Sequence, residues 1–553
     1  MRKILVLAVA LAVVWAAGAM AFTPKHPVVL RDDNTLLKKP QGPLPTPLLV
    51  SPGYGVGVTD YDWQRNGSMI KTVALDGLHG VHVYWTLRTG GSQSTRRGFY
   101  NFKDETGTWL GGLAHDARVS RMGSLGVLSD GRACPTSHVT LGSGPLASSV
   151  AVDAARGAGA FSSTDIDTAI AATWPSIAVG GSDVIHVVSV VGAPPTLYSR
   201  STNQGTTFSP YITLASDVNG AEYLALASRG LKVAFVYMDS SDYFGGNIWL
   251  RESNDAGATW GARSAIFTNA GVSVGWIMMD ALYSPTDLVH VVYTVWTDTT
   301  DPSSKAQIRH WSQATGETVV RNGTWNTNPG GNHLTVCQPS LGYQASANRW
   351  WCTWEEFTAA DTSTEGYANG EVWAAYSGDG GTTWSGARNL TNSPTPGAPP
   401  GACADDRYQS LAAVVDDTLR ILYESSFAAG SSLNDARSTL TLDTMRYYQT
   451  PATVGVEEFT GSEKAPASFE LGASRPNPTG AKTAIQYSLP AAAEVNLSVY
   501  NAAGQLVETL VSGHQAAGVH TASWEARSVP AGVYFYRLTA GTFAQTRSIV
   551  VVR

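Results

Sequence analysis

A short glycine-rich segment recurs along this chain, and its recurrence constrains the fold more than any other feature of the sequence. The clearest copies read SNDAGATW from Ser253 and SGDGGTTW from Ser377, and a third reads STNQGTTF from Ser201. Weaker copies are SQATGETV from Ser312 and FKDETGTW from Phe102. Because self-similarity at a regular spacing is typical of repeat architectures, the copies predict a chain built from repeated structural units.

Between the copies, a second pattern recurs: a short strand of alternating apolar residues, a turn, and another such strand. Its seven instances begin at Lys71, Leu125, Ile177, Leu224, Ile277, Leu341 and Leu411. Each unit has room for one four-stranded antiparallel sheet with two faces to bury, and radial stacking of the units buries both faces. The sequence therefore predicts an all-β protein whose main domain is a β-propeller of seven blades, or of six if the first or last unit is incomplete.

The shared pattern Ser-x-Asp-x-Gly-x-Thr-Trp resembles the Asp-box, the bacterial neuraminidase repeat found in sialidases and many other secreted propellers. The resemblance covers about residues 65 to 450 and implies the fold rather than one activity. In a tight turn the Asp or Asn oxygen accepts backbone hydrogen bonds, Gly adopts a conformation that is costly for other residues, and the aromatic side chain packs between sheets. We therefore expect a structural role for Asn203, Gly205, Asp255, Gly257, Trp260, Asp379, Gly381 and Trp384. Each box offers at most one carboxylate, too few ligands for calcium, so neither a metal site nor a cofactor is expected.

The residues just before each innermost strand of a propeller converge near the central channel, where ligand sites tend to form. Aligning the units places Gly67, Arg121, Thr173, Gly220, Ser273, Cys337 and Arg407 in one column. In a seven-membered ring the units of Arg121 and Arg407 lie two positions apart, so both guanidiniums can face one anionic group. Alternatively, each arginine pairs with a neighbouring carboxylate. The candidate ligand-binding residues are Arg121, Arg407, Asp406, Glu222 and Trp174, with Asp405, Glu355 and Glu356 nearby and Trp350 and Trp351 as further exposed stacking surfaces.

A working sialidase, by the resemblance, has three arginines around the substrate carboxylate, a Tyr–Glu nucleophile pair and an aspartic acid that donates a proton. The column here holds two arginines, and the first unit opens with NGSMIKTVALD instead of an Arg-Ile-Pro segment. We therefore expect a non-catalytic protein that binds an extracellular glycan or another polymer. A sialidase-like glycoside hydrolase is the alternative, and no catalytic residue is assigned.

The N-terminus resembles a secretory signal peptide over residues 1–21, where Arg2 and Lys3 precede an apolar run that ends in Ala19-Met20-Ala21. No later stretch approaches the length of an apolar membrane span, so no transmembrane segment is expected after signal removal. With 37 Lys and Arg against 44 Asp and Glu, the formal charge of −7 argues against nucleic acid as a partner. Disulfides are possible in an exported chain, so either Cys337 and Cys403 pair across neighbouring units or all four cysteines are buried thiols.

The remaining sequence divides into an N-terminal extension at 22–64, the propeller at 65–449, a linker at 450–468 and a second domain at 469–553. Short alternating strands in the second domain predict a small immunoglobulin-like β-sandwich. Its segments SRPNPTGAKTAIQYSLP, VYNAAGQLVETLVSG and VPAGVYFYRLTAGTFAQTRSIVVV resemble, in order, the C-terminal sorting domain of type IX secretion substrates. That resemblance implies an address read by the secretion machinery and a protein that is secreted or associated with the outer membrane at the bacterial cell surface. A plain immunoglobulin-like binding module is the alternative.

Overall fold

The chain divides into two compact units, Met1–Gly455 and Val456–Arg553. The computed structural model describes residues 51–64, 71–142, 144–191, 193–217, 224–239, 246–269, 274–297, 306–323, 328–330, 333–432 and 440–452 and, with short gaps, 470–552. The predicted signal peptide, most of the predicted linker, and Gly67, Gly220, Glu222 and Ser273 lie outside these residues. In the described part of the chain, no helix is long and apolar enough to cross a membrane.

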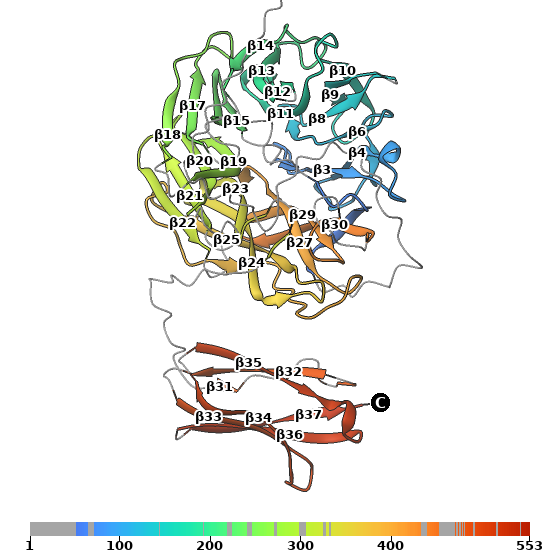
Figure 1. Ribbon diagram of the computed structural model, residues 1–553, viewed down its shortest axis with the longest axis vertical. Helices are drawn as coiled ribbons and strands as arrows, with labels where there is room; N and C mark the ends of the chain where they lie inside the picture. Colours follow the sequence, from blue (N-terminus) through green and yellow to red (C-terminus); the bar gives the residue numbers. More distant parts are fainter. Residues whose placement is uncertain are drawn as a thin grey trace, which may run out of the picture. The chain divides into compact units, whose positions relative to one another are not determined.

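The first unit contains seven β-sheets in its described residues, arranged around a common centre (Figure 1). We number these sheets as blades 1 to 7 and give their strands from the inner to the outer edge. Blade 1 contains β2 (Val73–Leu75), β3 (Val81–Leu87), β4 (Arg97–Lys103) and β5 (Leu113–Ala114). Blade 2 contains β6 (Ser120–Arg121) with β7 (Leu125–Val127), β8 (Ala133–Thr140), β9 (Leu146–Asp153) and β10 (Phe161–Asp165). Blade 3 contains β11 (Thr173–Val179), β12 (Ile185–Val191), β13 (Ala193–Ser201) and β14 (Ile212–Ala215).

Blades 4 to 7 follow the same plan. Blade 4 contains β15 (Leu224–Arg229), β16 (Lys232–Met238), β17 (Ile248–Ser253) and β18 (Ser264–Phe267), and blade 5 contains β19 (Val274–Tyr283), β20 (Val289–Trp296), β21 (Ala306–Ser312) and β22 (Gly316–Asn322). Blade 6 contains β23 (Val336–Gln344), β24 (Arg349–Thr362), β25 (Ala368–Ser377) and β26 (Arg388–Asn389), with β28 (Val414–Val415) beside β23. Blade 7 contains β27 (Asp405–Leu411), β29 (Thr418–Ser426), β30 (Asp443–Pro451) and β1 (Tyr54–Thr59). Short 3₁₀ helices occur at η1 (Gln93–Thr95), η2 (Gly181–Asp183) and η3 (Ala345–Ala347).

The blades form a closed ring. The inner strands touch one another in the order β2, β7, β11, β15, β19, β23 and β27, and β27 touches β2 again. The last blade joins the two ends of the unit, because its outer strand β1 pairs antiparallel with β30 and sets Tyr54 opposite Tyr447. The predicted seven-bladed propeller is therefore confirmed, and its last blade includes residues 54–59, which the sequence analysis placed in the N-terminal extension.

The central strands of the blades are buried on both faces. In β20 every residue from Val289 to Trp296 is buried, because blades 4 and 6 cover the two faces of blade 5. Apolar burial of this kind drives the stacking of the blades.

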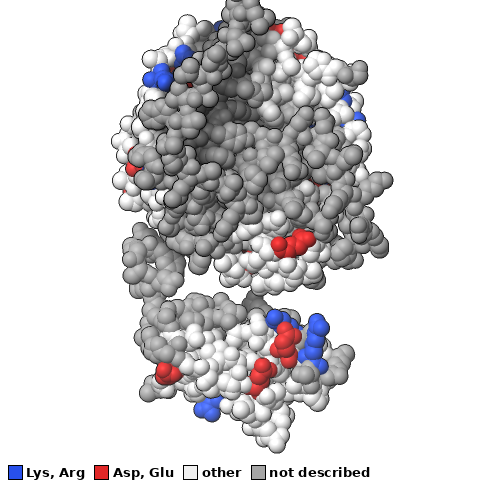
Figure 2. Space-filling view, in the orientation of Figure 1, with Lys and Arg blue, Asp and Glu red and all other residues white. Residues whose placement is uncertain are grey.

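At the surface, the charged side chains of the described residues are scattered among neutral ones on the face drawn in Figure 2.

The glycine-rich boxes form turns between the third and fourth strands of their blades. In the copy after β25, the Ser377 hydroxyl donates to Asp379 Oδ1 at 2.8 Å and accepts from the Gly381 N–H at 2.7 Å. Asp379 Oδ1 also accepts from the Thr383 N–H at 2.9 Å. The side chains thus satisfy the backbone donors of the turn, as Asx-type turns do.

Two other boxes repeat this geometry. Asp255 Oδ1 accepts from the Thr259 N–H at 2.8 Å, and Asn203 Oδ1 accepts from the Thr207 N–H at 3.0 Å. The box glycines Gly205, Gly257 and Gly381 all have a positive φ, between 77° and 93°. The terminal indoles contact neighbouring rings: Trp260 packs edge-on to Tyr198 with centroids 5.1 Å apart, and Trp384 to His310 with centroids 5.4 Å apart.

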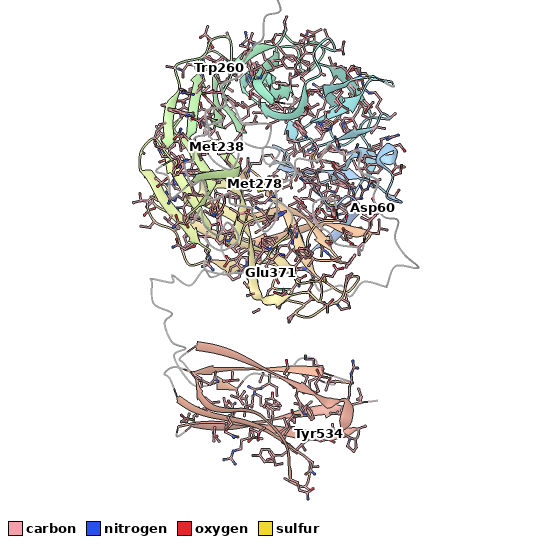
Figure 3. The ribbon with its side chains drawn as sticks, viewed as in Figure 1. Asp60, Met238, Trp260, Met278, Glu371 and Tyr534 are labelled. Atoms are coloured by element: carbon pink, nitrogen blue, oxygen red, sulfur yellow. The ribbon has the colours of Figure 1, made fainter. Side chains whose placement is uncertain are left out.

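The second unit is a sandwich of two sheets. One contains β31 (Glu470–Leu471), β32 (Lys482–Leu489) and β35 (Gly518–Glu525), the other β34 (Leu506–Gln515), β33 (Ala493–Tyr500), β36 (Gly532–Ala540) and β37 (Phe543–Val551), and η4 (Ala526–Ser528) follows β35. Apolar side chains from both sheets form one core, which includes Tyr534 of β36 (labelled in Figure 3). Trp524 of β35 meets Tyr534 at 5.2 Å between ring centroids. The predicted small sandwich is confirmed.

Candidate functional site

The inner strands of five blades carry a backbone irregularity on the channel side. The residues Met122, Trp174, Met278, Gln338 and Tyr408 have left-handed φ angles between 49° and 83°. In blades 3, 5, 6 and 7, the pairing register between the first and second strands shifts at the left-handed residue of that blade. In blade 2, the left-handed Met122 separates β6 from β7. Such bulges redirect side chains next to functional sites. Four residues of the sequence-aligned column, Arg121, Thr173, Cys337 and Arg407, directly precede these left-handed residues.

An aromatic cluster gathers residues from several inner strands. Met122 and Tyr408 pack with Tyr61 and Trp63, which follow β1, and Trp174 contacts the same cluster while half-buried. Tyr408 Oη donates to the Asp62 carbonyl at 3.1 Å. The segment after β1 is therefore packed between blades 2 and 7.

The predicted exposed positions of Trp350 and Trp351 are wrong, because both indoles are buried. Trp350 stacks on His290 with ring centroids 3.8 Å apart. The Trp351 N–H donates to Gln344 Oε1 at 3.2 Å. Adjacent side chains of a strand point to opposite faces, and here neighbouring elements cover both faces of the blade.

The two arginines of the column are buried among protein partners. Arg407 Nε donates to Asp405 Oδ2 at 2.6 Å, and Nη2 donates to the carbonyls of Pro329 and Ala368. Arg121 Nε lies 2.6 Å from Nε2 of His138. The structure thus brings Arg407 together with a neighbouring carboxylate, which is the second of the two arrangements considered from the sequence.

Asp406 faces away from its neighbour Arg407 and joins a buried acidic pair. Its Oδ1 accepts from the Ser51 hydroxyl at 2.8 Å and its Oδ2 from the Ser393 hydroxyl at 2.9 Å. The Ser393 N–H donates at 2.7 Å to Glu371 Oε1 (Glu371 is labelled in Figure 3). Burial raises the pKa of Asp406 to about 6, while burial and the charge of Asp406 raise the pKa of Glu371 to about 8. This pair can hold a proton at neutral pH.

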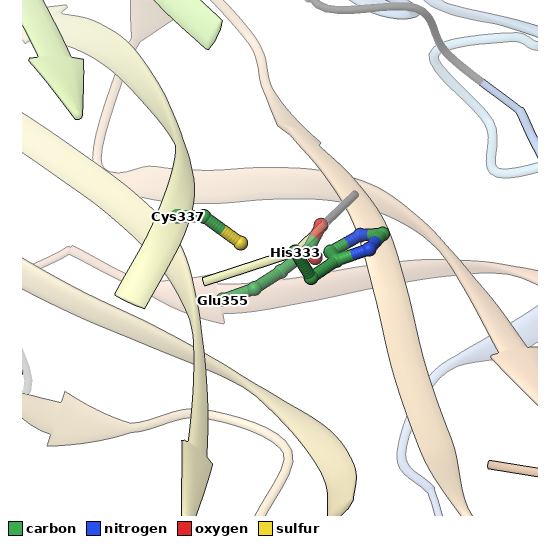
Figure 4. Close-up of side chains that lie close together, drawn as sticks. All are labelled: His333, Cys337 and Glu355. Atoms are coloured by element: carbon green, nitrogen blue, oxygen red, sulfur yellow. Dashed lines mark ion pairs between the residues drawn. The ribbon is translucent and has the colours of Figure 1, made fainter. Parts of the chain in front are cut away.

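A second buried cluster lies near Arg407 in blade 6. His333, Cys337 and Glu355 each direct one metal-ligating atom to a common region (Figure 4). All four cysteines of the chain are buried and none forms a disulfide, so the considered Cys337–Cys403 bond is absent. Cys403 Sγ instead lies 3.6 Å from the Pro399 carbonyl oxygen. Sequence reasoning missed the cluster because its three residues come from a loop and two different strands.

An aromatic groove lies at the outer edge of the propeller, where blade 7 meets blade 1. It has a volume of ≈ 680 Å³, and its lining includes Tyr54, Lys103, Trp109, Tyr447 and Gln449. The ring planes of Tyr54 and Trp109 are within 5° of parallel, with centroids 5.8 Å apart, and Trp109 meets Tyr447 edge-on at 5.3 Å. Tyr54 is 58% exposed.

The polar groups of the groove are held in place by one another. Gln449 Oε1 accepts from Lys103 Nζ at 3.2 Å and from Tyr447 Oη at 3.1 Å. Lys103 Nζ also lies 5.3 Å from the centroid of the Tyr447 ring. Sequence reasoning missed this groove because Tyr54 lay in the presumed extension and Trp109 ends the FKDETGTW box, whose indole was expected to be structural.

Comparison with family models finds a match in the second unit. Residues 474–542 match the family model of the FlgD Ig-like domain. No curated protein matches the chain significantly.

Solved structures with a similar fold include several propellers. A PL25 ulvan lyase has 11% sequence identity and a TM-score of 0.47, over 72% of this chain and 96% of that chain. A Hadza microbial sialidase has 14% identity and a TM-score of 0.36, over 65% of this chain and 74% of that one. An α-L-arabinanase of Penicillium chrysogenum has 11% identity and a TM-score of 0.39, over 60% and 93%. At these values the likeness is one of fold and does not extend to activity.

Proposed function

We propose that this protein binds an extracellular glycan, without cleaving it, in the aromatic groove between blades 7 and 1. The observation that carries the proposal is the nearly parallel ring pair of the exposed Tyr54 and the half-buried Trp109 beside the side chains of Lys103 and Gln449. The volume of the groove, ≈ 680 Å³, lies within the usual range for ligand sites, roughly 300–1,000 Å³.

The chemistry of the groove suits a sugar chain. A pyranose ring has apolar C–H faces and a rim of hydroxyl groups, so it packs on aromatic faces while its rim makes hydrogen bonds. Tyr54 and Trp109 supply the faces, and the exposed Gln449 amide supplies donors and an acceptor. Lys103 adds a cation that can meet a uronate or sulfate group on the same chain. Tyr54 and Tyr447 stand opposite each other on paired strands, which gives the groove a rigid base.

The arrangement of the arginines supports binding better than sialidase-like hydrolysis. Arg407 is 2% exposed and bonds to Asp405 and to backbone carbonyls, so its guanidinium is already used within the protein. A substrate carboxylate would have to displace a buried ion pair to reach it, at a cost of several kcal/mol, on the order of 3–5.

Binding of the purified full-length protein to three polysaccharides tests the proposal: a neutral glucan, a polyuronate and a sulfated galactan, each measured by affinity electrophoresis and titration calorimetry. Tyr54→Ala and Trp109→Ala are expected to weaken binding by about tenfold each, because each removes a stacking face. Lys103→Ala is expected to weaken binding of the acidic chains only. Phe535→Ala, which removes an exposed aromatic side chain from the second unit, serves as the control.

The outcomes separate clearly. Binding of one or more chains that falls in the groove variants and not in the control supports the proposal. Equal binding by wild type and groove variants, or no binding to any of the three polysaccharides, contradicts it. Release of reducing sugar by the wild type would contradict the non-catalytic part alone and favour the sialidase-like alternative.

We further propose that the second unit directs export through a secretion machine that reads a C-terminal sandwich, and that the protein reaches the cell surface or the medium. The ordered sandwich and the three sequence segments resembling a type IX sorting domain support this role. Fusion of residues 469–553 to a periplasmic reporter, expressed in a bacterium with such a machine, should move the reporter to the surface or medium. A reporter that remains periplasmic with and without the fusion would contradict the proposal.

A further inference from the structure

A His–Cys–Glu cluster lies inside blade 6, away from the aromatic groove. His333 precedes β23, Cys337 lies in β23, and Glu355 stands directly opposite Cys337 on the paired strand β24. One ligating atom from each residue lies within 4.8 Å of the other two, and all three side chains are buried (Figure 4). An imidazole, a thiol and a carboxyl group at such distances form a donor set that suits zinc.

The carboxylate of Glu355 is only partly satisfied by the protein. Its Oε1 accepts from the Gln409 N–H at 3.0 Å. Its Oε2 lies 3.1 Å from His333 Nε2, but no described residue donates a directed hydrogen bond to this oxygen. This oxygen therefore has an imidazole beside it but accepts no aligned hydrogen bond, and for a buried carboxylate a further positively charged partner is favourable.

A fourth donor stands beside the cluster. Gln338, which follows Cys337 in the left-handed bulge, places its side-chain amide nitrogen 3.4 Å from His333 Nε2. Its Oε1 is buried, and no described group donates to it. Because the amide oxygen and nitrogen exchange places by a half-turn, the same rotation directs Oε1 to the cluster.

We propose that His333, Cys337 and Glu355 bind a zinc ion, with the Gln338 amide oxygen at the fourth position. Binding releases the Cys337 thiol proton to solvent and joins a thiolate, a carboxylate and a neutral imidazole to a dication. The resulting site has no net charge, as a buried site requires. Tetrahedral ligands about 2.0–2.3 Å from zinc stand roughly 3.5 Å apart, so the cluster needs to contract by about 1 Å at its widest separation.

The neighbouring arginine is compatible with this site. Arg407 Nη1 lies 3.3 Å from His333 Nδ1, the ring nitrogen that carries the proton when Nε2 binds the metal. Both groups are then donors, so zinc binding moves the His333 imidazole away from Arg407 Nη1 as the cluster contracts, while Arg407 keeps its bonds to Asp405 Oδ2 and to the backbone carbonyls. The charge of Arg407 is cancelled by Asp405, which lies 2.6 Å away.

The experiment measures metal in the full-length protein. Wild-type protein purified from zinc-supplemented medium is expected to retain about one zinc per chain after desalting, by plasma mass spectrometry. Chelator treatment followed by cobalt addition is expected to produce a thiolate-to-cobalt absorption band in the near ultraviolet. Cys337→Ser should abolish the band, and His333→Ala and Glu355→Gln should weaken cobalt binding by at least about tenfold.

Cys352→Ser is the matched control, because Cys352 is another buried thiol of blade 6 outside the cluster. This variant should keep both the zinc and the cobalt band. Wild-type protein that neither retains zinc nor develops the band overturns the proposal without recourse to any variant. A band that persists in Cys337→Ser also overturns it. A site that fails this test leaves the proposed glycan groove unaffected, since Tyr54 and Trp109 belong to a different part of the propeller.

Discussion

Gly381 lies against the imidazole of His310 so closely that a Cβ atom on Gly381 would stand 2.0 Å from the ring carbon Cε1. Gly381 belongs to the box turn of blade 6, whereas His310 lies in β21 of blade 5. A contact of the same kind joins blades 3 and 4, where a Cβ on Gly257 of blade 4 would stand 1.7 Å from Tyr198 Oη of blade 3. The box glycines therefore allow each turn to pack directly on the preceding blade, in addition to closing their own hairpin.

Gly381→Ala should destabilise the propeller more than Gly380→Ala. Both glycines have positive φ, +93° and +74°, so both alanines are strained. A Cβ on Gly380, however, meets nothing within 4 Å, whereas one on Gly381 collides with His310. We expect Gly381→Ala to lower the free energy of unfolding by about 1–3 kcal/mol beyond the control, as overpacking does. Urea unfolding of both variants measures the difference, and equal losses would show that the contact between the blades is unimportant.

The repetitive part of this fold could be predicted from sequence because each blade carries its own local signals. Within each blade, the alternating strands and the box turn, such as the turns with Asp255 and Asp379, lie within a few dozen residues of one another. The order of the strands in each blade can therefore be read from the chain. The closure of the ring has no such signal. β1 pairs with β30 from the other end of the unit, and Tyr54 is the partner of Tyr447 only through that pairing.

The candidate sites were harder to predict for the same reason. The sequence aligns Arg121 and Arg407 in one column near the inner strands, but it does not reveal the bulges beside them or which carboxylate or imidazole each contacts. The groove depends on Tyr54 and Trp109 meeting across the seam between the last and first blades. Likewise, the ligating atoms of His333 and Glu355 meet only after β23 pairs with β24.

Acid should destabilise the propeller through its buried histidines. Burial lowers the pKa of His186 and His290 to about 4 and that of His310 to about 3. In the unfolded chain these side chains titrate near 6.5, so below that pH the unfolded state binds protons that the folded state excludes. The free energy of unfolding is therefore at its full value above pH 6.5 and decreases as the pH falls towards 4, by up to about 1.4 kcal/mol per pH unit for each histidine.

Chemical unfolding of the full chain between pH 4 and pH 7, followed by tryptophan fluorescence, measures this slope. His290→Asn should flatten it, whereas His79→Asn should leave it unchanged, because the His79 side chain is 73% exposed. A slope that is the same in wild type and His290→Asn would show that His290 is not held neutral in the fold.

The acidic pair Glu371 and Asp406 should give the opposite dependence at higher pH. Because the folded pKa of Glu371 is raised to about 8, the folded state keeps a proton that the unfolded chain releases near 4.3. The protonated Glu371 therefore contributes its full stabilisation below about pH 4.3, and this stabilisation is lost as the pH rises towards 8. Glu371→Gln should remove the loss and make the protein more stable than wild type at pH 8.

Unfolding of this variant between pH 5 and pH 9 is the measurement, and Glu105→Gln is its control, since Glu105 lies on the surface. The control should preserve the wild-type slope. If Glu371→Gln proves less stable than wild type at pH 8, the carboxyl is ionised in the fold and its bonds to Thr391 and Ser393 dominate.

Loss of the Asp405 carboxylate should be among the most damaging changes in the propeller. Asp405 Oδ2 binds the buried Arg407 guanidinium, and Oδ1 accepts from the Gly370 N–H at 2.6 Å. Asp405→Ala leaves a buried charge unpaired, so we expect a loss of about 3–5 kcal/mol in the free energy of unfolding. Asp130→Ala, which breaks a more exposed pair with Arg132, should cost at most about 1 kcal/mol. Adding Arg407→Met to Asp405→Ala should recover part of the stability, because the unpaired charge is then removed. Thermal and urea unfolding of Asp405→Ala, Arg407→Met, the double variant and Asp130→Ala test this, and a double variant as unstable as the sum of its two single changes would show that the two side chains act independently.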